Sequence, residues 1–217
     1  MRYVAILTIL LAVTSCSIEC QELTADTYDN LRTPDQDLRV SLTKGSFDFF
    51  EGNTKLDSSK IAFLAKIGVP AYAQEIGFGI PVEVTLAQSI LESGWGTSEL
   101  SESYHNYFGI KARKSQASVT MSTKEYVAGK RITKKARFRK FDSPEQAIAE
   151  RTQWFLNNWR YRKINFDDHD YKSFCDLLQA KGYATDPHYS TKLQFIIERY
   201  NIDNYASWLR NNLPKYE

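Results

Sequence analysis

The stretch PVEVTLAQSILESGWG, residues 81–96, decides the fold. Its apolar residues recur at the three- and four-residue spacing of a helix face, whereas Thr85, Gln88 and Glu92 form a polar stripe on another face. A proline opens the stretch, as at many helix starts, and Gly-Trp-Gly breaks the helix directly after Glu92. We therefore expect a buried helix over residues 81–93, with its polar stripe lining a cleft.

Beyond this helix, the sequence from residue 58 onwards predicts further helices and one small sheet. Pro70 lies where helices tend to start, so we expect a helix that begins there. Residues 119–126 alternate with a period of two, and residues 136–139 have the pattern of a return strand after a turn near residues 128–129. The remaining helices are expected from Ser143-Pro144 through Trp159, over residues 171–181, after Asp186-Pro187 and after Asp203. The predicted fold class is α+β, mainly helical, with a β-hairpin flanking the cleft.

The N-terminus indicates export. Arg2 precedes an apolar run over residues 3–13, which is too short to span a membrane but suits a secretory signal. The run ends in Val13-Thr14-Ser15-Cys16, which is similar to the lipobox of bacterial lipoproteins, whose cysteine is acylated. An ordinary signal peptide, cleaved nearby, is the alternative. We expect residues 1–16 to be a signal segment ending at a lipidated Cys16, in a protein anchored to the cell envelope on its periplasmic or surface side.

Residues 17–57 are polar and acidic with no sustained hydrophobic period, so we expect a tether or a loosely packed arm before one folded domain over residues 58–217. Cys175 lies in an apolar stretch and is expected to be a buried core residue, and a bridge to Cys20 is permitted but not indicated. The three histidines are scattered, and no spacing suits a metal site, so neither a metal nor another cofactor is expected. The formal charge of +2 is too small to imply a nucleic-acid partner by itself.

Glu92 has the properties of a proton-donating acid. Cleavage of a glycosidic bond needs a carboxyl group that keeps its proton near neutral pH, and an apolar, partly desolvated position favours such a group. Glu92 ends an apolar helix, where the helix dipole disfavours a carboxylate, and Trp95 follows closely. The alternative is a solvated residue at a helix end, and the physics of the sequence alone supports both equally.

Four blocks of sequence decide between these alternatives. They are Ile90-Leu91-Glu92-Ser93-Gly94-Trp95-Gly96, Asn106-Tyr107-Phe108-Gly109-Ile110-Lys111, Thr123-Lys124-Glu125-Tyr126 and Gly182-Tyr183-Ala184-Thr185-Asp186-Pro187. In this order they closely resemble the glucosaminidase family 73 of glycoside hydrolases, over residues 58–205. The resemblance implies a lysozyme-like α+β fold and an endo-β-N-acetylglucosaminidase that cleaves β-1,4 bonds between N-acetylglucosamine and N-acetylmuramic acid in peptidoglycan.

The resemblance also assigns roles to residues within these blocks. Glu92 stands where the family has its general acid, Glu125 stands at its second acidic position on the hairpin, and Tyr183 aligns with a tyrosine that lines the cleft. A second carboxylate such as Glu125 can activate water or stabilise positive charge on the sugar or its acetamide. Without the family, Glu125 would be interpreted as a solvated strand residue.

Further substrate contacts are expected from the first two blocks. Asn106 and Tyr107 are expected to hold the N-acetyl group, and Trp95 to shield Glu92 or stack on a sugar ring. Phe108 and Ile110 are instead expected to pack as core residues beneath the hairpin. Asp186 is expected to cap a helix rather than to take part in catalysis.

A basic run covers the hairpin region. Eleven Lys or Arg residues and one acidic residue, Glu125, lie between Lys111 and Lys140. Such a run is usually a solvated face, but peptidoglycan carries lactyl and stem-peptide carboxylates, so we expect this run to recruit glycan strands. The export signal and the four blocks outweigh nucleic-acid binding. We expect a monomer.

Three other functions remain open. A lytic transglycosylase shares the fold, leaves a 1,6-anhydro end on muramic acid and would not need Glu125. A non-catalytic peptidoglycan-binding lipoprotein is a second alternative, against which the presence of both Glu92 and Glu125 argues. The third is an enzyme that acts on host N-glycans, and no feature of the sequence selects it.

Overall fold

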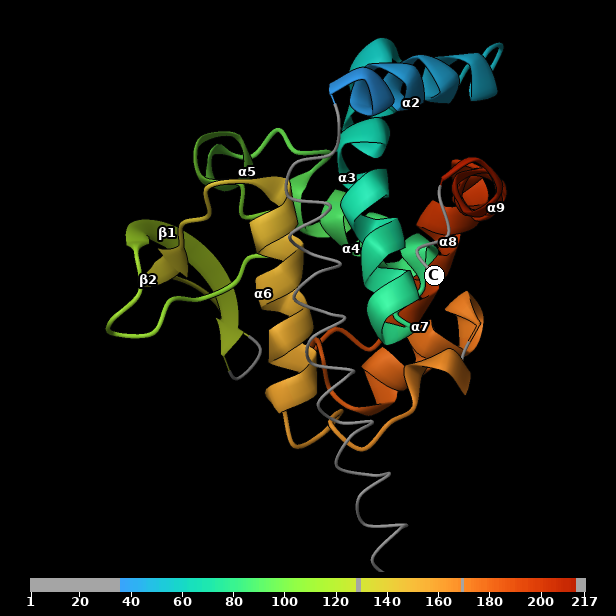
Figure 1. Cartoon of the computed structure of the whole chain (residues 1–217). Coiled ribbons are helices and arrows are strands. Elements are labelled where there is room, and N and C mark those ends of the chain that lie inside the picture. The colour runs from blue at the N-terminus through green and yellow to red at the C-terminus, as the bar shows by residue number, and fades with distance from the viewer. Residues whose placement is uncertain (1–35, 128–129, 169, 214–217) are drawn as a thin grey trace, which may run out of the picture.

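The structure is a computed structural model that describes residues 36–127, 130–168 and 170–213 (Figure 1). For residues 36–39, 124–127, 130–132 and 168 it describes the backbone only. The two strands stand to one side of the helices, beyond α6 (Figure 1), and the predicted α+β class is confirmed. The elements are, in order, α2 (Gln36–Phe49), α3 (Ser58–Phe78), α4 (Val82–Ser93), α5 (Glu99–Tyr104), β1 (Ser118–Val127), β2 (Lys130–Arg139), α6 (Pro144–Asn157), a 3₁₀ helix (Phe166–Asp168), α7 (Tyr171–Ala180), α8 (Tyr189–Arg199) and α9 (Ile202–Asn212).

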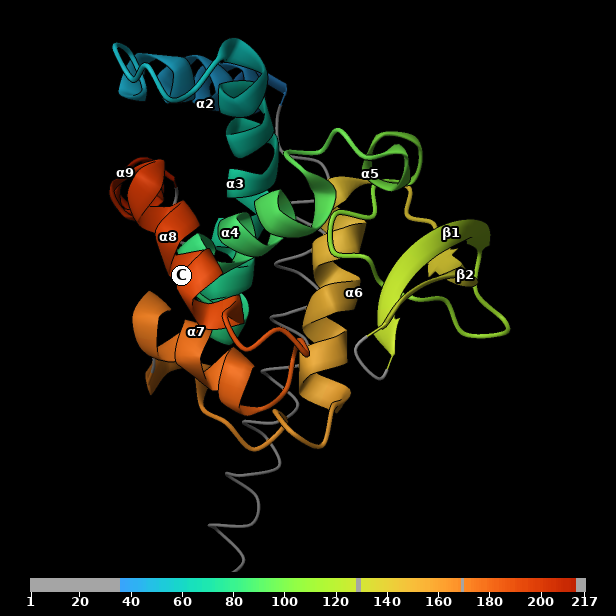
Figure 2. The ribbon, with the colours of Figure 1, turned by 180° about the vertical axis from the view of Figure 1, so that it is seen from behind.

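Helix α4 lies among the other helices as the central element (Figure 2), since it packs against α3, α7, α8 and α9, and its residues 82–90 are all buried. At its start, the Glu75 carboxylate accepts the Val82 N–H at 2.8 Å and satisfies one of the free donors of the first turn. At its end, Gly94 adopts the left-handed conformation with a φ of 59° and donates its N–H to the Ile90 carbonyl. The helix predicted for residues 81–93 is confirmed.

Helix α3 differs from the sequence prediction. It begins at Ser58, where the Asp57 carboxylate accepts the Lys60 N–H at 3.0 Å, and Pro70 lies inside it rather than at a start. A proline inside a helix removes one hydrogen bond and costs about 3 kcal/mol. Most residues of α3 between positions 61 and 74 are buried, and this packing outweighs the local cost. A prediction based on proline position alone is therefore wrong here.

The tether predicted for residues 17–57 is wrong for residues 36–57, because helix α2 and the turn after it pack against α3 and α9. Leu42 and Phe50 are buried, and the Phe50 ring centre lies 4.9 Å from that of Tyr205. The Ser46 hydroxyl lies 2.7 Å from the Tyr205 hydroxyl. The sequence appears polar because α2 buries only one narrow face. Residues 1–35, with the signal segment, Cys16 and Cys20, lie outside the described residues.

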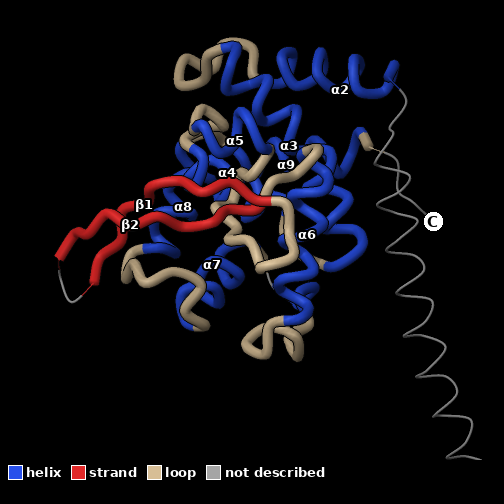
Figure 3. Tube along the Cα trace, turned by 90° about the vertical axis from the view of Figure 1, so that its left-hand side faces the viewer, coloured by secondary structure: helices blue, strands red, loops and turns tan. Residues whose placement is uncertain are grey.

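The predicted hairpin is confirmed. Strands β1 and β2 pair antiparallel from Ser118 opposite Arg139 to Val127 opposite Lys130 (Figure 3), and residues 128–129 between them lie outside the described part. Phe138 is buried and also pairs with Lys111 in an isolated bridge. This bridge attaches the segment before β1 to the hairpin.

The C-terminal helices begin and end close to the predicted positions. Ser143 caps α6 by accepting the Gln146 N–H at 3.2 Å, but α6 ends at Asn157, so Trp159 lies beyond it and is 74% exposed. Cys175 on α7 is fully buried, as predicted, and burial raises the pKa of its thiol to about 12. In the described ranges, no helix combines the length and the apolar character that crossing a membrane requires.

Candidate active site

A cleft of about 550 Å³ lies where the end of α4, the segment before the hairpin, α6 and the loop before α8 meet. Segments that are far apart in the sequence thus come together at Glu92. The cleft is lined by Glu92, Phe108, Gly109, Ile110, Lys111, Arg151, Trp154, Tyr183, Ala184 and Thr185.

Glu92 occupies the last turn of α4 and opens into this cleft. Although the residue is exposed on the cleft side, the surrounding protein partly desolvates its carboxyl group, and this desolvation raises the pKa. The Tyr189 hydroxyl donates to Glu92 Oε1 at 3.3 Å, which opposes part of that rise. A raised pKa favours the protonated form that a general acid needs. Glu92 can therefore deliver a proton to a group bound in the cleft.

A buried polar network lies behind Glu92. Arg151, from α6, is 1% exposed and donates through Nη1 to Gln74 Oε1 and Thr85 Oγ1, each at 3.2 Å. Its Nη2 donates to Gln88 Oε1. The predicted polar stripe of α4 therefore exists, but Thr85 and Gln88 meet Arg151 in the interior, and only Glu92 reaches the cleft.

Residues 108–111 form a second wall, and Asn106 holds this segment in place. Asn106 Oδ1 accepts the Ile110 N–H at 2.9 Å, and its Nδ2 donates to the carbonyls of Ile110 and Arg139, each at 2.9 Å. Because Asn106 is 1% exposed, its amide is committed to the backbone rather than to an N-acetyl group. Phe108 is buried in the core, as expected, and half-buried Ile110 packs against that core, but both residues also line the cleft, whereas Asn106 supports this wall from behind.

Tyr107 and Trp95 are not brought into the cleft lining. Tyr107 is 1% exposed, and its hydroxyl lies 3.2 Å from His105 Nδ1. Trp95 is half-buried and meets the Tyr200 ring edge-on, with a centroid distance of 4.8 Å. Both rings also pack on Phe63, at 5.9 Å for Tyr107 and 6.1 Å for Trp95. These two predicted substrate-binding residues therefore support the site from the core.

Trp154 and Tyr183 supply an aromatic wall. Trp154 is 39% exposed, and its ring meets that of Tyr183 edge-on at 5.5 Å between centroids. Tyr183 is stacked on Tyr189 at 5.5 Å, and burial raises the pKa of Tyr183, so its phenol stays neutral. Flat apolar faces of this kind suit the face of a pyranose ring. Tyr183 lies in the cleft lining, where the resemblance places it.

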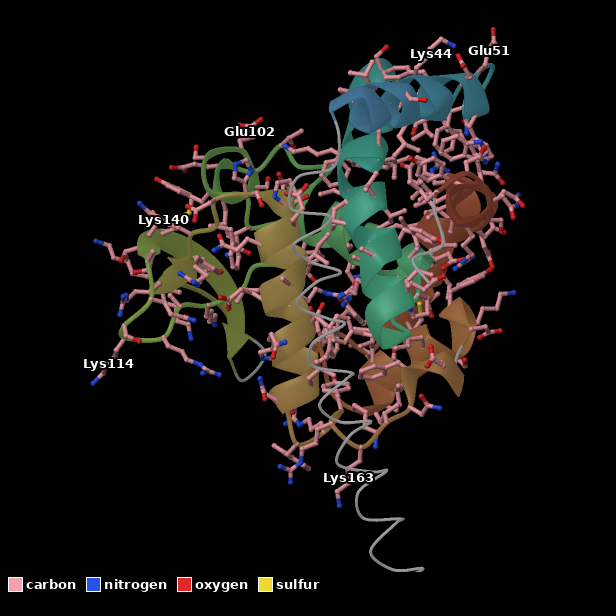
Figure 4. All side chains as sticks on the ribbon, viewed as in Figure 1. Lys44, Glu51, Glu102, Lys114, Lys140 and Lys163 are labelled. Atoms are coloured by element: carbon pink, nitrogen blue, oxygen red, sulfur yellow. The ribbon has the colours of Figure 1, made fainter. Side chains whose placement is uncertain are left out.

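Glu125 lies in β1 opposite Ile132 of β2, and its side chain is outside the described part of the chain. Basic residues gather on the hairpin side, where Figure 4 shows Lys114 and Lys140 projecting outward. Lys111 lines the cleft itself, whereas Arg139 pairs with Glu150 at 3.2 Å. The basic run therefore contributes one residue to the cleft lining and another to an ion pair within the domain.

Two further features concern metal binding and Asp186. Within the residues that the structure describes, no three His, Cys, Asp or Glu side chains group so that they could hold a metal ion. The Asp186 carboxylate accepts the His188 N–H at 2.9 Å and pairs with Lys192 at the start of α8. Asp186 thus holds the turn before α8, but the N-cap position itself is His188, two residues after the predicted cap.

Sequence reasoning missed Arg151, Trp154 and Tyr189. Tyr189 carried a usable signal, since it directly follows the turn over residues 182–188. Trp154 could be recognised only through Arg151, which lies three residues before it on the same helix face. Arg151 carried none, because an arginine in a helix is usually solvated and nothing in its neighbours indicates burial.

Comparisons with known proteins agree with this geometry. The sequence model of the glucosaminidase family, described as mannosyl-glycoprotein endo-β-N-acetylglucosaminidase, matches residues 69–202. The chain is 40% identical over 126 residues to the exo-glucosaminidase LytG of Bacillus subtilis, covering 56% of this chain and 45% of that protein. It is 35% identical over 144 residues to the peptidoglycan hydrolase FlgJ of Escherichia coli K12, covering 64% and 46%. The chain thus spans a little under half the length of these relatives.

Solved structures show the same fold. The catalytic domain of the autolysin Auto from Listeria monocytogenes superposes with a TM-score of 0.61 at 29% identity, covering 75% of this chain and 96% of that chain. A C-terminally truncated glycoside hydrolase domain of FlgJ from Salmonella typhimurium gives a TM-score of 0.54 at 34% identity, covering 66% and 98%. The similarity thus runs through nearly the whole of the Auto and FlgJ domains, and the lysozyme-like fold is confirmed. The chain belongs to the glucosaminidase family 73 of glycoside hydrolases.

Proposed function

We propose that this chain is a peptidoglycan hydrolase that cleaves the β-1,4 bond between N-acetylglucosamine and N-acetylmuramic acid from within glycan strands. The observation that carries the proposal is the position of Glu92. In the described part of the chain, it is the only carboxylic acid that lines the cleft, its carboxyl is partly desolvated, and aromatic rings lie beside it. Membership of the family and the names of the relatives support the same substrate.

The chemistry follows from one acid and one further carboxylate. Glu92 gives its proton to the glycosidic oxygen as the bond from C1 to that oxygen breaks, and the leaving sugar departs as an alcohol. Positive charge then develops at C1 and on the ring oxygen. We assign Glu125, on the hairpin, to stabilise this charge or to take a proton from the water that adds to C1. Trp154 and Tyr183 hold the sugar rings.

A second candidate concerns the other bond of the polymer. Relatives are named for both bonds, since the chain is also 33% identical over 160 residues to a probable N-acetylmuramidase of Lactococcus lactis. The glucosaminidase family model and the higher identity to LytG favour the glucosaminidase bond. A lytic transglycosylase is a further outcome of the same test.

The test is an analysis of the new ends released from purified sacculi. The digest is reduced with borohydride, and the products are identified by mass spectrometry. We expect reduced N-acetylglucosamine at the new ends. Reduced N-acetylmuramic acid would show a muramidase, 1,6-anhydro ends would show a transglycosylase, and intact sacculi would leave only a binding function.

We also propose that the protein is exported and held at a membrane by a lipid on Cys16. The support is the lipobox-like sequence Val13-Thr14-Ser15-Cys16, which lies outside the described residues. Intact-mass analysis of protein from its own host should show an acylated first residue, Cys16. An unlipidated chain with another first residue would contradict the anchor without affecting the enzymatic proposal.

A further inference from the structure

Two side chains link Glu92 to the buried Arg151. Arg151 Nη2 donates to Gln88 Oε1, and Gln88 Nε2 donates to the Tyr189 hydroxyl oxygen at 2.7 Å. The Tyr189 hydroxyl in turn donates to Glu92 Oε1 at 3.3 Å. Arg151 comes from α6, Gln88 and Glu92 from α4, and Tyr189 from α8, so the chain of hydrogen bonds crosses three helices that lie close together (Figure 2).

The direction of these hydrogen bonds follows from the chemistry of the guanidinium group, which donates and cannot accept. The Gln88 amide must therefore turn its oxygen toward Arg151 and its NH₂ group toward Tyr189. The Tyr189 oxygen accepts from this NH₂ group, which leaves its own single hydrogen for Glu92. With a neutral acceptor at position 151, Gln88 could turn its oxygen toward Tyr189, and the Tyr189 hydroxyl would then donate to Gln88 instead of to Glu92.

Arg151 is itself held rigidly. Its Nη1 donates to Gln74 and Thr85, and its guanidinium carbon lies 5.0 Å from the centre of the Phe108 ring and 4.8 Å from that of Phe155. A cation fixed between two rings and two acceptors has little freedom to change partners. The orientation of Gln88 is therefore fixed by the core and does not depend on a bound substrate.

We propose that Arg151 is a positioning residue: through Gln88 it makes the Tyr189 hydroxyl a donor to Glu92 Oε1, so that Oε2 carries the proton delivered to the substrate. An oxygen that already accepts a hydrogen bond is the poorer site for a proton. Without this arrangement, the Tyr189 oxygen could accept the Glu92 proton and keep it from the glycosidic oxygen. The inference rests on the proposed role of Glu92 as general acid.

Other titratable and charged groups lie around Glu92, and a test must separate their effects on its pKa from the effect of the hydrogen-bonded chain. Lys111 lines the cleft beside it, Tyr183 and Tyr189 face it from the loop before α8 and from α8 itself, and Arg151 faces it from α6. Burial raises the pKa of both tyrosines, so they stay neutral. The positive charge of Arg151 also acts on Glu92 directly through space, and this effect does not need Tyr189.

The experiment compares Tyr189→Phe, Arg151→Met and the double variant. In each, the Glu92 carboxyl is titrated by ¹³C NMR with labelled glutamate, the signal being assigned from Glu92→Gln. Tyr189→Phe removes a hydrogen bond that favours the ionised form, so the titration should move upward, by about 0.5 pH unit or more. Arg151→Met should move it upward too, and the shift that Arg151→Met causes should be smaller in the Tyr189→Phe background than in the wild-type background.

An Arg151→Met shift of equal size in both backgrounds would mean that Arg151 acts only through its charge, and would overturn the proposal. So would an unshifted titration in Tyr189→Phe. Arg210→Met is the matched control, because it removes another arginine that bridges two helices, away from the cleft, and should leave the Glu92 titration unchanged.

If Arg151→Met does not fold, Gln88→Glu replaces it, because a carboxylate at position 88 still pairs with Arg151 but takes the Tyr189 hydrogen away from Glu92. The upward shift of the Glu92 titration that Gln88→Glu causes should be larger when Tyr189 is present than in the Tyr189→Phe background. Equal shifts in the two backgrounds would overturn the proposal. The titration needs no turnover. Failure of the wild-type chain to cleave sacculi would instead count against the proposed function.

Discussion

Two glutamates at opposite ends of α4 differ in their partners. Glu83, in the first turn, is 5% exposed, and its carboxylate accepts from Arg210 at 2.9 and 2.8 Å. Glu92, in the last turn, accepts from the neutral Tyr189 hydroxyl at 3.3 Å. Burial raises the pKa of both, but at Glu83 the arginine opposes the rise. The same residue type on one helix thus forms a structural ion pair at one end and, as we propose, the proton donor at the other.

The surroundings of the two carboxylates reinforce the difference. A hollow of about 310 Å³ lies beside Glu83, and Arg210 pairs there with both Glu75, at 2.6 Å, and Glu83, at 2.8 Å, so both glutamates already have an ionic partner within the protein. The helix dipole favours a carboxylate at the position of Glu83 and disfavours one at that of Glu92. An unfavourable charge beside a cleft is the better indication of function.

The largest expected effect is on turnover in Glu92→Gln. Glutamine keeps the shape of the side chain but cannot donate an acidic proton, so turnover should fall by about 10²–10⁴-fold. Binding of glycan should survive, because the cleft walls are unchanged. A steady-state assay on sacculi measures turnover, and sedimentation of the variant with sacculi measures binding. Glu125→Gln should also slow turnover, by a factor that depends on whether the acetamide assists.

Glu83→Gln should show the opposite behaviour. It weakens charge-assisted hydrogen bonds to Arg210, so the free energy of unfolding should fall by about 1–3 kcal/mol. Turnover per folded molecule should stay near the wild-type value, since Glu83 lies at the other end of α4. Urea denaturation and the same sacculus assay measure the two quantities. A loss of turnover without a loss of stability would erase the distinction between the two glutamates.

The pH dependence sharpens the comparison further. A general acid works while protonated, so kcat/KM should fall about tenfold per pH unit above the pKa of Glu92. The sign for stability is the same: because the folded pKa is raised, the contribution of Glu92 is present below its unfolded pKa and is lost as pH rises through the folded pKa. Glu92→Gln should remove both dependences. An alkaline limb that persists in this variant would assign it to another group.

The smallest effect is expected at the basic hairpin. The Arg137 side chain is exposed and donates to Ser118, whereas Arg139 pairs with Glu150. Arg137→Gln and Lys140→Gln should weaken binding to sacculi about twofold to threefold at low salt, and less at high salt. Arg139→Gln should also lower the unfolding midpoint. If these variants bind sacculi as tightly as the wild-type chain at low salt, the basic residues of the hairpin are only a solvated face.

Local signals in the sequence were enough for the elements that depend on local chemistry. Helix α4, the existence of the hairpin and the Ser143 cap follow from periodicity and capping residues. Pro70 and helix α2 were predicted wrongly, because tertiary packing outweighs a local proline cost in one case and a polar composition in the other.

The site was predictable only where a motif carried it. Glu92 and Tyr183 lie in the cleft lining, but Asn106 binds the backbone instead of facing the cleft, and Phe108 borders the cleft as well as the core. Whether an amide faces a ligand or the backbone depends on contacts that the sequence does not show. Arg151 is the extreme example, since its burial is created by three helices that meet only in the folded chain.

Digestion of sacculi in H₂¹⁸O by the wild-type chain and by Glu92→Gln tests the central claim most directly. The wild-type chain should add one ¹⁸O atom at C1 of each new N-acetylglucosamine end, measured by mass spectrometry after immediate borohydride reduction. Glu92→Gln, folded by circular dichroism, should release fewer such ends by about a hundredfold or more. A folded Glu92→Gln that releases labelled ends at the wild-type rate would contradict the assignment of Glu92 as the acid.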